Sequence, residues 1–221
     1  MRFRFNWCLA IGAVCSLGSL VSLAASAEGA ADGFLRKLDE TWPTNVSRAS
    51  DGTVIGLIVP FDFTNERNLA LIGQLSKLAE LKLYASSTSL SPRAVADLRS
   101  LSHLTNLTIA CALVLQDNVL EAVGHLETLR SLTLNSSVPP TREYPVLTNL
   151  LRLEELTILG ASNFGDKELK LLESLPNLRR LTLGGTGVSD SWPAAVRQFP
   201  SLVNAVVTRR GESLRWSRTK D

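Results

Sequence analysis

Few residues in this sequence could carry out acid–base or nucleophilic chemistry. There are two histidines, His103 and His125, and each lies in a leucine-rich stretch just before a predicted strand. A catalytic histidine needs a nucleophile and an orienting acid, and neither is spaced around these two. We interpret both as solvated or capping residues. Cys111 is the one cysteine after residue 27, and a small buried residue is favoured over a reactive thiol.

Motifs for metals and phosphates are also missing from the sequence. It contains no His-x-x-x-His, no Cys-x-x-Cys and no Asp-rich calcium loop. Gly184-Gly185 follows a predicted strand, but this pair suits a turn and forms no phosphate-binding loop. We therefore expect no catalytic residue, no metal and no cofactor, and predict that the chain is not an enzyme.

The elements that must position any site come from an internal repeat of the form Leu-x-x-Leu-x-Leu. Seven copies start 24 to 26 residues apart, too regular a spacing to arise from composition alone. Alternate side chains of a strand face the same way, so the last two apolar residues of each copy point inward together. One copy cannot bury this face, whereas stacked copies form a parallel sheet over a continuous core. The seven copies start at Val54, Leu78, Leu104, Leu129, Leu153, Leu178 and Leu202.

Between these strands the apolar spacing changes to three or four residues, which predicts short helices that return the chain. Ser91, Asp117, Asp166 and Asp190 are predicted to cap their first turns. The segment from Ser136 to Leu150 is different because its three prolines exclude a regular helix, so we expect an irregular loop there.

The repeats resemble those of leucine-rich-repeat proteins, in particular a bacterial, planctomycete-like exported subtype with Leu-x-x-Leu-x-Leu-x-x-Thr repeats. The segment from Leu178 to Asp190 (LRRLTLGGTGVSD) follows this pattern closely, and the resemblance covers residues 54–207. It implies an α/β fold: a right-handed solenoid, or horseshoe, with a parallel sheet on the concave face and short helices on the convex face. It also implies binding of proteins or other macromolecules, with no catalytic residues.

Segments outside the repeats are predicted to be caps. Residues 28–53 contain an amphipathic helical patch followed by Asp51-Gly52, a hairpin signal, and we expect them to cover one end of the core. The repeat domain runs over residues 54–208. Residues 209–221 form a polar C-terminal tail, expected to cap or fray at the other end.

Residues 1–27 are predicted to be a signal peptide. Arg2 and Arg4 precede an apolar run from Trp7 to Leu23, and Ala25-Ser26-Ala27 offers a cleavage site after Ala27. The expected location is therefore secreted, periplasmic or in the cell envelope. The apolar run approaches the length of a membrane span, so an uncleaved N-terminal anchor is the alternative. Lipidation of Cys15 is less favoured because its neighbours lack the lipoprotein pattern.

Charge gives the mature chain no general attraction for polyanions. Loss of Arg2 and Arg4 reduces the 23 basic residues to 21, equal to the 21 acidic residues. A neutral chain attracts neither nucleic acid nor anionic lipid, so we expect no nucleic-acid partner. The missing phosphate and metal motifs lead us to expect no small-molecule cofactor.

The outward face of the sheet is the predicted place for a binding site. Its central column reads Ile58, Lys82, Thr108, Thr133, Thr157, Thr182 and Val206. The threonines suit strands and cross-strand hydrogen bonds, so we give them a structural role. Tyrosine and arginine are favoured at interaction hot spots, and this face offers one of each near a few charges. The candidate binding residues are Glu80, Lys82, Tyr84, Glu155 and Arg180.

The sequence thus predicts a non-catalytic binding or scaffold module of an exported protein, engaged in protein–protein interaction. Its partner is an unknown protein or cell-envelope macromolecule. The alternative is a structural envelope protein anchored in the membrane through residues 5–23. An enzyme acting through Cys111 is a third hypothesis, which thiol reactivity tests.

Overall fold

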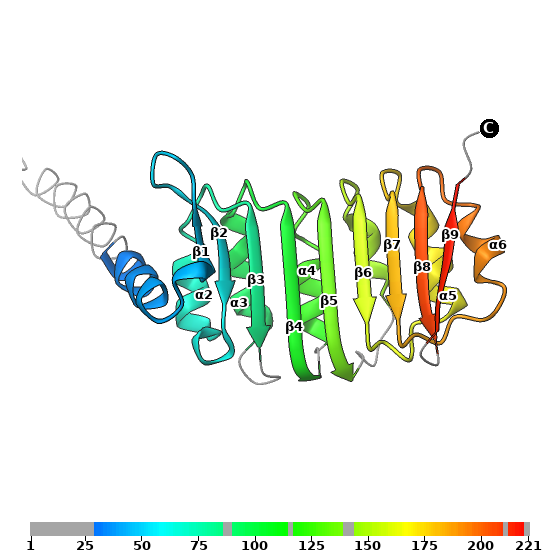
Figure 1. Ribbon diagram of the computed structural model, residues 1–221, viewed down its shortest axis with the longest axis horizontal. Coiled ribbons are helices and arrows are strands. Elements are labelled where there is room, and N and C mark those ends of the chain that lie inside the picture. The colour runs from blue at the N-terminus through cyan, green and yellow to red at the C-terminus, as the bar shows by residue number, and fades with distance from the viewer. Residues whose placement is uncertain (1–28, 86–89, 115–116, 139–143, 210–211, 219–221) are drawn as a thin grey trace, which may run out of the picture.

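A computed structural model describes residues 29–85, 90–114, 117–138, 144–209 and 212–218. They form one nine-stranded sheet whose strands follow one another in chain order (Figure 1). Strands β2 to β8 are parallel, and β1 and β9 are antiparallel at the two edges. The strands are β1 Val46–Arg48, β2 Val54–Val59, β3 Glu80–Ala85, β4 Asn106–Val114, β5 Ser131–Val138, β6 Glu155–Leu159, β7 Arg180–Gly184, β8 Asn204–Arg209 and β9 Glu212–Ser217. The predicted leucine-rich-repeat solenoid is confirmed.

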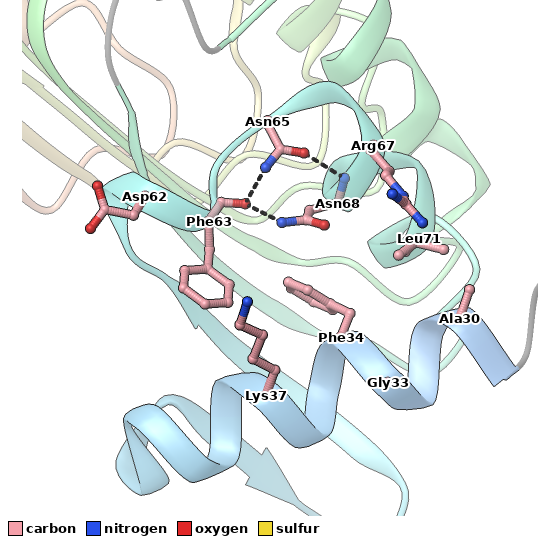
Figure 2. A pocket seen from close by; sticks show the side chains of 10 residues that line it. All are labelled: Ala30, Gly33, Phe34, Lys37, Asp62, Phe63, Asn65, Arg67, Asn68 and Leu71. Carbon is pink, nitrogen blue, oxygen red and sulfur yellow. Dashed lines mark hydrogen bonds between the residues drawn. The ribbon is translucent and has the colours of Figure 1, made fainter.

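At the N-terminal end, a helix over residues 29–41 packs beside the first repeat. Its Phe34 side chain is buried and meets Phe63 with 6.5 Å between ring centroids (Figure 2). The chain then forms a 3-10 turn, η1 (Pro43–Asn45), and strand β1, which pairs with β2. Gly52 has a φ of 84°, a conformation that suits glycine, and the predicted hairpin at Asp51-Gly52 is confirmed. The predicted signal peptide, residues 1–27, lies outside the described residues.

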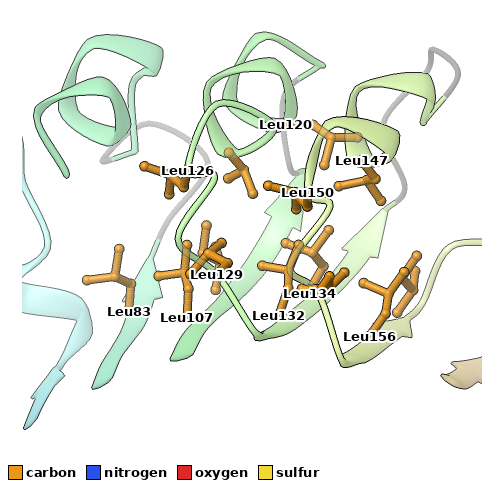
Figure 3. Packing of buried hydrophobic residues seen from close by; sticks show 14 of the residues in the cluster. Leu83, Leu107, Leu120, Leu126, Leu129, Leu132, Leu134, Leu147, Leu150 and Leu156 are labelled. Carbon is orange, nitrogen blue, oxygen red and sulfur yellow. The ribbon is translucent and has the colours of Figure 1, made fainter. Parts of the chain in front are cut away.

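The core lies between the sheet and the helices and is built from columns of leucine. Leu107, Leu132 and Leu156 are in register on β4, β5 and β6, and each is 1% exposed (Figure 3). Burying one such side chain stabilises the fold by roughly 1.5–3 kcal/mol. Because each column continues through every parallel strand, the repeats share one core and no single repeat closes its own.

The return segments are short helices on one side of the sheet (Figure 1). They are α2 Glu66–Ile72, α3 Pro92–Ala96, α4 Asp117–Val123, α5 Asp166–Leu171 and α6 Trp192–Val196, with the 3-10 turns η2 Phe61–Phe63, η3 Asp97–Ser100, η4 Pro145–Asn149 and η5 Leu172–Ser174.

Ser91 is the only one of the four predicted caps that the structure shows in that role. It accepts a hydrogen bond from the Ala94 N–H at 3.2 Å. The predictions for Asp166 and Asp190 are wrong. Asp166 is the first residue inside α5, after Gly165, and Asp190 lies one residue before the N-cap of α6. Both carboxylates bind the following loop or strand instead: Asp166 the backbone of Ser189, and Asp190 the side chain of Arg209. The Asp117 side chain lies outside the described part.

The proline-containing repeat has no α-helix in its described part and forms the 3-10 turn η4 instead. Tyr144 precedes η4, is 1% exposed and meets the Phe164 ring edge-on with centroids 5.2 Å apart. Tyr144 thus adds an aromatic side chain to the core beside the 3-10 turn of this repeat.

The C-terminal end has a strand, β9, within the segment that was predicted to be a polar tail that caps or frays this end. β9 pairs with β8 over six register positions, from Asn204 with Ser217 to Arg209 with Glu212. Trp216 is the register partner of Ala205 and packs, partly buried, against the core.

Candidate functional site

The open face of the sheet, opposite the helices, carries the predicted columns. Lys82, Thr108 and Thr133 are consecutive register partners on β3, β4 and β5. Thr157, Thr182 and Val206 continue the column across β6, β7 and β8. The predicted alignment is confirmed, because a sheet with one strand per repeat leaves no other register for the leucine columns.

Three of the five candidate binding residues lie on β3. Lys82 Nζ is 2.8 Å from Glu80 Oε1, and both side chains are partly exposed. Tyr84 follows on the same face and is 47% exposed. The ammonium and carboxylate neutralise each other, which leaves the tyrosine ring as the largest uncovered feature of this strand.

The other two candidates, Glu155 and Arg180, lie on β6 and β7. They are register partners, and their side chains form an ion pair. β4 and β5 separate them from the β3 residues, a distance of roughly 14 Å at the usual strand spacing. The structure therefore brings the five candidates together as two clusters on one face and not as a single site.

The space between the clusters is polar and uncharged. Asn106 and Ser131 pair across β4 and β5 in one column, and Thr108 and Thr133 in the next. Hydroxyl and amide groups of this kind can donate and accept hydrogen bonds but attract no ion. A partner on this face would meet two neutralised ion pairs, a polar centre and one exposed aromatic ring.

Two further exposed residues were not predicted from the sequence. Phe61 lies in η2, directly after β2 and Pro60, and is 49% exposed. Arg215 on β9 is the register partner of Val206, so it extends the central column. The alternation Leu214-Arg215-Trp216 is the signal that could have predicted β9, and with it Arg215.

The two histidines and Cys111 do not form a catalytic arrangement in the described structure. His103 is exposed, and its Nδ1 donates to the Ser76 carbonyl of the preceding repeat at 2.9 Å, a capping role. His125 is exposed after α4. Cys111 is 5% exposed and faces the core, so the predicted buried position is confirmed. Within the described residues, no group of three or more His, Cys, Asp or Glu side chains could hold a metal ion.

Comparisons with known proteins find similarity only among solved structures. No protein-family model and no curated protein matches the sequence. Internalin C2 from Listeria monocytogenes is similar over 64% of this chain, with 20% identity and a TM-score of 0.46. A second Listeria monocytogenes internalin, inlF, is similar over 81% of this chain, with 16% identity and a TM-score of 0.43. The matched region covers 56% of each internalin chain, so this chain corresponds to about half of either one.

Proposed function

We propose that this chain is a non-catalytic leucine-rich-repeat module that binds another protein through the open face of its sheet. The observation that carries the proposal is the half-exposed ring of Tyr84 beside the Glu80–Lys82 ion pair. A tyrosine buries a large area on binding at a small cost in conformational entropy, and its hydroxyl adds a directional contact. The Glu155–Arg180 pair and Arg215 would form the far side of the contact.

The neutral character of the face favours a protein or another envelope macromolecule over a polyanion. Glu80 and Lys82 cancel, as do Glu155 and Arg180, so Arg215 is left as the one unpaired charge among these five residues. Nucleic acid would require an array of free cations along the surface.

The test is affinity capture from the source organism's envelope fraction with the full chain as bait, followed by a titration of the captured partner. We expect Tyr84→Ala to weaken binding about tenfold or more, as loss of a hot-spot side chain does. Leu151→Ala is the matched control, because Leu151 is 57% exposed but lies in the turn before β6. Unchanged affinity in Tyr84→Ala would remove the open face from consideration.

We also propose that the module is exported and that residues 1–27 are removed. The support is the sequence of that segment: two arginines, an apolar run and small residues at Ala25 to Ala27. No helix within the described ranges is long and apolar enough to cross a membrane. N-terminal sequencing of the protein isolated from cells should give Glu28 as the first residue, whereas an intact N-terminus in the membrane fraction would establish the anchored alternative.

A further inference from the structure

A groove lies at the N-terminal end of the solenoid, away from the open face. The helix over residues 29–41 forms one wall, and η2 with the start of α2 forms the other (Figure 2). Its volume is about 530 Å³, within the range of sites that hold a small ligand or a few side chains.

The floor of the groove is apolar and already ordered. Phe34, Phe63 and Leu71 line it, and the Phe63 ring is held edge-on against Trp42 with centroids 5.4 Å apart. Gly33 lies on the helical wall, and a Cβ placed there would meet no atom within 4 Å. The missing side chain at this position therefore leaves the groove open above the two phenylalanines.

Two cations at the groove have no carboxylate partner. Lys37 Nζ lies over the Phe63 ring, 5.6 Å from its centroid. Arg67 points along the opposite wall (Figure 2). Among the described residues, neither side chain forms an ion pair or hydrogen bond, although five other ion pairs occur in that part of the chain.

The nearby acids do not satisfy these cations. The Asp62 carboxylate lies beyond Phe63, on the side away from Arg67 (Figure 2). Glu66 accepts a hydrogen bond from the Ser91 hydroxyl at 2.6 Å, which holds it toward the next repeat. An apolar floor between two free cations is complementary to an apolar group that carries a negative charge beside it.

We propose that this groove binds a short segment of a partner protein in which an aromatic or aliphatic side chain stands next to an acidic residue. The apolar side chain packs over Phe34 and Phe63 in the space left by Gly33. The neighbouring carboxylate pairs with Arg67, and Lys37 contributes a second positive charge. This site is independent of Tyr84, so the chain has two separate binding surfaces.

A displayed library of random heptapeptides, selected on the immobilised full chain, tests the proposal. Enriched peptides are resynthesised and titrated against four variants. Gly33→Trp fills the groove, and Arg67→Glu reverses its charge. Arg93→Glu is the matched control, because Arg93 is the second residue of α3 as Arg67 is of α2. Tyr84→Ala tests independence from the open face.

The expected peptides carry Asp or Glu next to Phe, Trp, Tyr or Leu. Gly33→Trp should abolish their binding, and Arg67→Glu should weaken it about tenfold or more. Arg93→Glu and Tyr84→Ala should leave it within about twofold. Circular dichroism of each variant confirms that it is folded, and Arg67→Glu remains decisive if the tryptophan variant is not. The proposal is overturned if no peptide is enriched, if the enriched peptides lack acids, or if both groove variants bind them as the wild type does.

Discussion

At the scale of single residues, several polar side chains of the described repeats bind the backbone of a neighbouring repeat. His103 contacts the Ser76 carbonyl, and the Thr128 hydroxyl donates to the Leu104 carbonyl at 2.7 Å. Asp166 accepts from the Ser189 N–H at 2.8 Å. Each of these contacts joins residues more than 20 positions apart in the sequence. Histidine, threonine and aspartate, which can act in catalysis in other proteins, therefore stabilise the packing of adjacent repeats here.

Asp166 gives this role a pH dependence. Hydrogen bonds from the side chain and backbone of Ser189, with a smaller contribution from the charge of Arg209, lower the pKa of its carboxyl from the usual 3.8. A folded-state pKa below the unfolded value means that the ionised carboxylate stabilises the fold fully above about pH 4, and that this is lost as the pH falls through the lowered pKa.

We therefore expect Asp166→Asn to destabilise the protein by roughly 0.5–1 kcal/mol at pH 7, and by progressively less below pH 4. Thermal unfolding of the wild type and the variant between pH 7 and pH 2 measures the difference. Asp62→Asn is the control, because Asp62 is exposed and no hydrogen bond to its carboxylate occurs among the described residues. A difference that persists undiminished at pH 2 would assign the effect to shape and not to charge.

At the scale of elements, the strands could be predicted far better than the segments between them. The leucine columns require a period of two and a spacing of 24 to 26 residues, so strand positions and register follow from sequence. The caps depend on contacts between repeats: the wrong predictions for Asp166 and Asp190 arose because each carboxylate has a distant partner. Strand β9 was not predicted because it lies outside the repeat. Its sequence signal consists of two alternating apolar residues, Leu214 and Trp216. The groove at the N-terminal end could not be predicted, because it depends on how the helix over residues 29–41 packs against the first repeat. No local sequence pattern specifies that packing.

Close packing between return segments gives an element-scale prediction at Gly124, which directly follows α4. A Cβ there would lie 2.7 Å from the Val146 carbonyl oxygen in η4. This oxygen belongs to the backbone and cannot move away by a side-chain rotation, so the contact would be a steric clash. Gly124→Ala should therefore cost about 1–3 kcal/mol through overpacking. Gly33→Ala makes the same change in a helix with open space and should be neutral or stabilising by up to about 1 kcal/mol.

Urea unfolding of the two glycine variants gives the free energies, provided that the m value stays constant. Equal destabilisation in both variants would indicate a general requirement for glycine flexibility. Loss of stability in Gly124→Ala alone would establish the contact between α4 and η4.

At the scale of the whole molecule, the repeats of the solenoid stack in one dimension, so the apolar core must be covered separately at each of its two ends. Inner repeats bury their leucines against neighbours on both sides, whereas an end repeat has one neighbour. At the N-terminal end, Phe34, Leu35 and Leu38 of the helix over residues 29–41 are buried with the core. At the C-terminal end, β9 turns back on β8, and Trp216 packs against the last part of the core. At each end an antiparallel strand pairs with the outermost parallel strand, so the series of parallel repeats ends there.

The covering of the C-terminal end of the core by β9 can be tested by substitutions at two neighbouring positions of this strand. Trp216 packs against the core, whereas Arg215 is the exposed partner of Val206 on the open face. Trp216→Ala should cost about 2 kcal/mol, less than the 3–5 kcal/mol of a fully buried tryptophan, and Arg215→Ala should cost less than about 0.5 kcal/mol. Because each repeat contacts only its neighbours, the loss should be local. We expect amide hydrogen exchange to accelerate most in β8 and β7 and least in β3. Uniform acceleration across all strands would show one cooperative unit, and no acceleration in Trp216→Ala would refute the capping role of β9.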